Sequence, residues 1–114
     1  MKKDNETWLI YEGNRIIEKK SRESSDFLSG LEKAIYDFWV IDYAIRNSGT
    51  LEPMRELSEN SLSRLKEFAK SNNCSHLCSM LELTNDENIF CDTYYQNFDN
   101  ACNDLRNLTR MENN

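Results

Sequence analysis

The chain has 114 residues and a formal net charge of −6, with 39% hydrophobic and 30% charged residues. This balance fits one folded domain with a real hydrophobic core and excludes a disordered chain. Three glycines and one proline are too few for the many turns of a β-sandwich, so we expect an all-α fold.

Residues 5–20 fit either a helix or a hairpin. A helix capped by Asn5 or Thr7 would carry its apolar residues on related faces. A hairpin would turn at Gly13 and Asn14, which form a good two-residue turn. The helical pattern of the rest of the chain favours the helix, because a lone hairpin is weakly stable, but both structures stay open.

The strongest helix pattern follows a polar linker over 19–25. Ser24 or Ser25 is expected to cap a central helix that runs from Phe27 to Arg46. Its apolar residues recur at three- and four-residue steps and form a wide stripe. A stripe of this width indicates a helix that is contacted on more than one side.

Polar residues mark the solvent-exposed face and the C-terminal end of this helix. Lys33, Asp37 and Arg46 indicate its wetter face. Asn47 and Gly49 are structural candidates, because both residue types tolerate the left-handed conformation that ends a helix.

Shorter patterns fill the rest of the chain. Pro53 is typical of the start of a short helix, and either Ser58 or Asn60 would begin the next one. We expect helices over 51–57, from 58 or 60 to about 71, over 74–83 and over 92–111, with a turn at 84–88 and a frayed tail at 112–114. The prediction is a single bundle of five or six helices.

Asp42 falls on the apolar stripe of the central helix. A carboxylate there needs a donor, such as Arg46 four residues later or a tyrosine hydroxyl. We expect Asp42 to have a structural role. Among the aromatic residues, Tyr43 or Tyr95 is expected to stay exposed, while most of the others belong to the core.

Cysteine and histidine residues suggest little chemistry. His76 lies about 200° around a helix from Cys74, so it cannot join Cys74 and Cys78 at a metal. We expect no metal, no cofactor and no catalytic residue. A small hydrolase or thiol enzyme that uses His76 or Cys78 is the less favoured alternative.

The acidic charge is concentrated in the last third of the chain. Residues 73–114 contain Arg106 and Arg110 against seven carboxylates. Such a segment repels phosphates, so we expect no direct contact with nucleic acid and favour a basic protein as partner. The candidate contacts are Asp86, Glu87, Asp92, Tyr95, Asp99 and Asp104. A purely solvated acidic surface and a homodimer formed by exposed aromatic residues remain alternatives.

No membrane segment is expected. The charged start of the chain does not fit a signal peptide, and no apolar run approaches the length of a membrane span. We therefore expect a cytoplasmic protein with four reduced cysteines.

Residues 34–105 resemble a family of small bacterial helical proteins that are related to a DNA-mimic protein and include immunity-type members. The segments that carry the likeness are FWVIDYAIRNSG, LEPM, SLSRLKEFAKSNN, CSHLCSML and CDTYYQNFDNACNDL. Asn47 and Gly49 match an Asn-Gly-Gly motif in which Ser48 replaces the first glycine. The resemblance implies an all-helical fold and a protein-binding role, with a toxin or a DNA-binding protein as the target.

Overall fold

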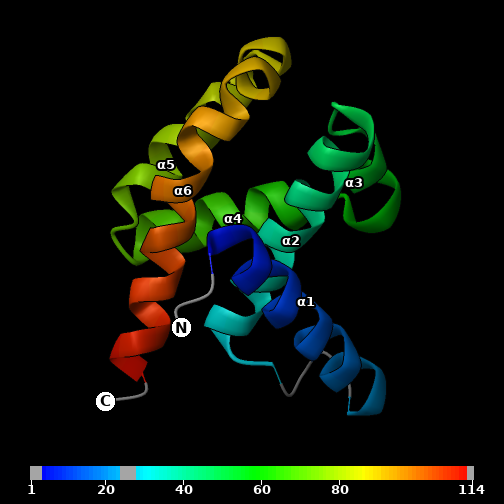
Figure 1. Cartoon of the computed structure of the whole chain (residues 1–114), viewed down its shortest axis with the longest axis vertical. Helices are drawn as coiled ribbons and strands as arrows, with labels where there is room; N and C mark the ends of the chain where they lie inside the picture. The colour runs from blue at the N-terminus through cyan, green and yellow to red at the C-terminus, as the bar shows by residue number, and fades with distance from the viewer. Residues whose placement is uncertain (1–3, 24–27, 113–114) are drawn as a thin grey trace.

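The computed structural model describes residues 4–23 and 28–112, and in these residues every regular element is helical (Figure 1). The elements are α1 (Asn5–Arg22), α2 (Gly30–Ser48), α3 (Glu52–Ser58), α4 (Ser61–Ser71), α5 (Ser75–Glu82), a 3-10 turn η2 (Leu83–Asn85) and α6 (Glu87–Glu112). The predicted all-α fold is confirmed. None of these helices is long and apolar enough to span a bilayer.

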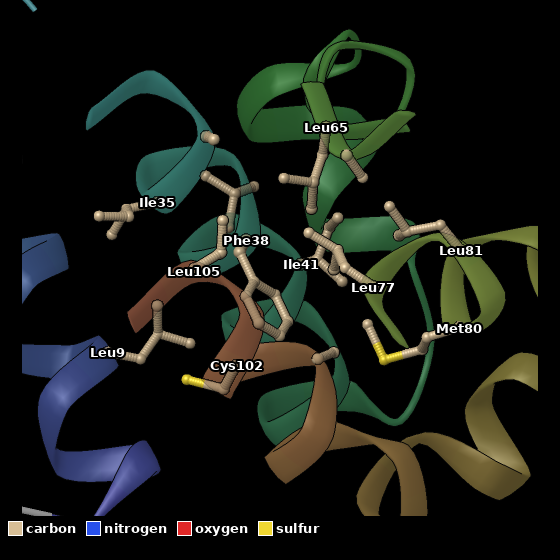
Figure 2. Packing of buried hydrophobic residues seen from close by; sticks show 14 of the residues in the cluster. Leu9, Ile35, Phe38, Ile41, Leu65, Leu77, Met80, Leu81, Cys102 and Leu105 are labelled. Atoms are coloured by element: carbon tan, nitrogen blue, oxygen red, sulfur yellow. The ribbon is translucent and has the colours of Figure 1, made fainter. Parts of the chain in front are cut away.

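α2 is the central helix, as predicted. It contacts α1, α3, α4 and α6, while α5 packs along α6 and reaches α4. Figure 2 shows Phe38 of α2 in the core, with Leu105 and Cys102 of α6 beside it. Phe38 and Cys102 are fully buried, so the wide apolar stripe does pack on several sides.

Residues 5–20 form helix α1 and no hairpin. Asp4, rather than Asn5 or Thr7, is the N-cap, and its Oδ1 accepts a hydrogen bond from the Thr7 N–H at 2.7 Å. Gly13 is buried in the middle of the helix, and a Cβ built there would lie 2.3 Å from Trp39 Cδ1. The glycine that suggested a turn therefore allows α1 to lie close against α2.

The boundaries of α2 differ from those predicted. The helix begins at Gly30, not Phe27, because Ser29 and Glu32 form a capping box across its first turn. The proposed caps Ser24 and Ser25 lie outside the described residues. The linker predicted over 19–25 begins later in the chain, since α1 continues through Arg22.

α2 ends at Ser48, two residues beyond the predicted Arg46, and Gly49 closes it as predicted. Gly49 takes a φ of 74° and its N–H bonds to the Ile45 carbonyl at 2.8 Å. Asn47 stays helical instead, and its side-chain amide donates to the Tyr43 carbonyl at 2.8 Å. Both residues are thus structural at this helix end.

α6 begins at Glu87, five residues before the predicted start. Asp86 Oδ1 accepts hydrogen bonds from the N–H groups of Asn88 at 3.1 Å and Ile89 at 3.4 Å. This aspartate caps the helix, so the last two residues of the turn predicted at 84–88 already belong to α6.

Asp37 is buried rather than on a wet face, which corrects the prediction. Only 1% of its surface is exposed. Its Oδ1 accepts hydrogen bonds from Ser61 Oγ and Arg64 Nη2, each at 2.8 Å, and its Oδ2 accepts one from Arg64 Nε at 3.2 Å. Burial raises the pKa of Asp37, and the Arg64 and Ser61 donors oppose that rise.

Candidate functional site

Asp42 lies at the buried end of a cluster of side chains that joins α2 to α6. Arg46 Nε donates to both carboxylate oxygens at 2.9 Å, and the Tyr94 hydroxyl donates to Oδ1 at 2.6 Å. Both kinds of donor that the sequence suggested are therefore present. Burial raises the pKa of Asp42, while these hydrogen bonds lower it.

Arg46 carries this cluster to the surface. Its guanidinium carbon lies 4.9 Å from the ring centroid of Phe98 and 5.1 Å from that of Tyr95. Its Nη1 lies 3.6 Å from Glu6 Oε1 on α1. Asp42 binds the guanidinium on its buried side. Arg46 is therefore held between α1, α2 and α6.

Tyr95 is the most exposed aromatic side chain of the described residues at 56%, and Tyr43 is 41% exposed. Asp92 and Asp99 lie three residues before and four residues after Tyr95, so all three share one face of α6. We call the surface formed by these residues and their α1 and α2 neighbours the Tyr95 face: Glu6, Tyr43, Arg46, Asp92, Tyr95 and Asp99.

The Tyr95 face carries an excess of negative charge. Glu6, Asp92 and Asp99 are exposed, whereas the positive charge of Arg46 is balanced by buried Asp42. Asp99 also accepts a hydrogen bond from the Asn5 side-chain amide at 3.0 Å. The side chain of Asp92 forms no hydrogen bond or ion pair with the part of the chain that the structure describes. The face thus combines aromatic surface with three exposed carboxylates.

The other predicted contacts lie elsewhere and support the fold. Asp104 Oδ2 accepts hydrogen bonds from the N–H groups of His76 at 2.9 Å and Leu77 at 3.0 Å, so it caps α5 from a neighbouring helix. Asp86 caps α6, and Glu87 forms an ion pair with Arg55 of α3. Asp104 is about 140° around α6 from Asp99. The six predicted contacts therefore do not form one patch.

The aromatic residues of α2 form a second surface feature that the sequence did not single out. Tyr36 and Trp39 stack at 6.3 Å between ring centroids, and Trp39 and Tyr43 stack at 5.6 Å. The three-and-four-residue spacing of these positions was the signal for it. The stack extends along α2 toward Arg46 and holds the ring of Tyr43, which is part of the Tyr95 face.

Two of the four cysteines, Cys74 and Cys102, are buried, and His76 is exposed. Burial raises the pKa of Cys74 to about 11 and that of Cys102 to about 12, so both thiols are protonated near neutral pH. His76 Nδ1 lies 3.4 Å from Asp104 Oδ1 at the surface. Within residues 4–23 and 28–112, no three His, Cys, Asp or Glu side chains are grouped to hold a metal ion.

No protein-family model matches the chain, and no curated protein or solved structure is significantly similar to it. The likeness of residues 34–105 to the DNA-mimic-like family therefore rests on the sequence pattern alone. The geometry of the Tyr95 face is the basis for a functional interpretation.

Proposed function

We propose that this chain is a non-enzymatic protein-binding module whose Tyr95 face covers a basic surface of a partner protein. The observation that carries the proposal is the placement of exposed Tyr95 between Asp92 and Asp99, beside anchored Arg46. Tyrosine and arginine are enriched among residues that dominate binding energy. Carboxylates around them would steer a cationic partner and exclude an anionic one.

Within this class we favour an inhibitor or immunity-type protein over a DNA mimic. A DNA mimic needs many free carboxylates at spacings close to those of phosphates. Asp86, Glu87 and Asp104 are instead committed to helix caps and an ion pair. An aromatic centre with an acidic rim fits a protein surface better than a phosphate-like array does.

The proposal is tested by titrating lysine- and arginine-rich peptides against the protein by calorimetry, with glutamate-rich peptides of equal length as a comparison. We expect saturable binding of cationic peptides that weakens as salt is added. Tyr95→Ala should weaken the binding of the tightest cationic peptide by about tenfold or more. Asp92→Lys should weaken that binding by a similar factor.

The matched control is Glu18→Lys, which makes the same charge change near the other end of the α1–α2 pair. Lys19, the next residue, contacts Glu32 in the first turn of α2, about 21 Å along the helix from Arg46. This variant should bind like the parent protein. Equal weakening by Glu18→Lys and Asp92→Lys would show that only net charge matters, and the proposal would fail.

Self-association is a second candidate, favoured by the exposure of Tyr43 and Tyr95. Sedimentation at several concentrations would separate the two functions. A monomer at all concentrations leaves the partner-binding proposal, whereas a dimer that Tyr95→Ala dissolves would assign the same face to a second copy of the chain.

A further inference from the structure

A basic hollow of about 250 Å³ lies between α1, α2 and α4, at the end of α2 opposite the Tyr95 face. Its walls are formed by three cationic residues, one carboxylate and two apolar or aromatic residues: Lys20, Lys33, Arg64, Asp37, Leu28 and Tyr36. In a protein of net charge −6, this gathering of cations is unexpected for a surface that has only to stay in solution.

The charges of the hollow leave it net positive. Asp37 is already bound by Arg64 Nη2 at 2.8 Å and Nε at 3.2 Å, so this pair is close to neutral. The side-chain ammonium of Lys33 forms no hydrogen bond or ion pair with any described residue. Lys20 Nζ lies 4.7 Å from the ring centroid of Tyr36 and keeps its ammonium N–H donors for another partner. Among the described residues that line the hollow, three cations therefore face one carboxylate.

Two of the walls are held rigid. The stack of Tyr36 on Trp39 fixes the aromatic wall, and the bidentate contact with Asp37 fixes the guanidinium of Arg64. Arg64 Nη1 makes no hydrogen bond among the described residues and is left as a donor. A preformed site of this kind loses little conformational entropy when a ligand binds.

We propose that this hollow binds a phosphate monoester with an aromatic organic group. The dianionic phosphate would lie between Lys20, Lys33 and Arg64, and the organic group would pack against Tyr36 and Leu28. Glu67 lines the adjoining hollow with Lys33 and Arg64, so its negative charge directs the phosphate toward the Lys20 side. This site is separate from the Tyr95 face and does not depend on the proposed partner.

The test is an NMR titration at constant ionic strength with phenyl phosphate, inorganic phosphate and phenol as probes. We expect saturable shifts of the Tyr36 and Arg64 amide resonances, with phenyl phosphate binding about tenfold more tightly than inorganic phosphate. No saturable shift with phenyl phosphate would overturn the proposal. Equal affinity for the two phosphates would overturn the role of the organic group, and equal binding of phenol would overturn the role of the phosphate.

Two variants and a matched control locate the site. Lys20→Gln and Lys33→Gln should each weaken the binding of phenyl phosphate by about tenfold. Lys70→Gln removes the same charge from an exposed position of α4 that is not among the lining residues, and it should bind like the parent protein. Thermal melts of all three variants verify that they fold. An equal loss in Lys70→Gln would mean a diffuse charge effect and would refute the site.

Discussion

At the scale of single residues, α2 contains two buried aspartates, each held by an arginine and a hydroxyl group. Asp42 is held by Arg46 and Tyr94, and Asp37 by Arg64 and Ser61. A buried carboxylate without such donors would cost several kcal/mol, by general estimates for buried ions. These contacts therefore fix α2 against α4 and α6 and hold Arg46 where the Tyr95 face needs it.

Removing the Tyr94 hydroxyl should destabilise the protein. In Tyr94→Phe, Asp42 loses the donor at 2.6 Å in a fully buried setting, at a cost of about 1–3 kcal/mol. Urea denaturation at neutral pH measures the change. Tyr43→Phe is the control, because its ring is 41% exposed, and it should leave stability unchanged. Equal effects of the two changes would contradict the role given to Asp42.

Cys102 should make the free energy of unfolding depend on pH in the alkaline range. Its pKa is raised from 9.0 to about 12, chiefly by burial. Because the unfolded chain releases this proton first, the contribution of the thiol to stability is complete below the unfolded pKa and falls as pH rises above it. Between about pH 8 and about pH 10 the loss is about 1.4 kcal/mol.

The measurement compares unfolding free energies of the parent protein and Cys102→Ala at these two pH values. Other titrating groups cancel in the difference. The destabilisation caused by Cys102→Ala should be smaller at the higher pH. A difference that does not change with pH would show that the thiol ionises equally in both states.

At the scale of elements, the sequence predicts which segments are helical better than it predicts where each helix begins and ends. Periodicity and Gly49 were sufficient for most of α2 and its C-terminus. The starts of α2 and α6 were missed because several Ser and Asp residues could act as caps. The choice of Ser29 and Asp86 depends on contacts made only in the folded helices. Asp37 was misplaced because its partner, Arg64, lies on another helix.

The contact of α1 with α2 is tested by Gly13→Ala. A Cβ there would lie 2.3 Å from Trp39 Cδ1, so the helices must separate or the indole must move. We expect a loss of about 1–3 kcal/mol, which exceeds the gain of about 1 kcal/mol in helix propensity. Asn14→Ala, at the exposed neighbouring position, should be neutral or stabilising in the same denaturation experiment. Stabilisation by both changes would contradict the close approach.

At the scale of the whole molecule, charge is divided between two ends of α2. The Tyr95 face at the C-terminal end has three exposed carboxylates, and the hollow near the N-terminal end is lined by two lysines and one arginine. Sequence counting found the acidic third of the chain, and Asp92, Tyr95 and Asp99 do share a face. Counting charges could not show that Asp104 lies apart from these three residues. Asp104 caps α5, and that role depends on how α6 packs against α5.

The central claim is that the Tyr95 face binds a cationic protein surface. The most direct measurement is an NMR titration of the labelled protein with the lysine- or arginine-rich peptide that binds most tightly. We predict that the resonances of Tyr43, Tyr95 and Asp99 shift together and saturate, while those of Glu18 stay in place. Shifts spread evenly over the exposed carboxylates, with Glu18 moving as much as Asp99, would contradict the account.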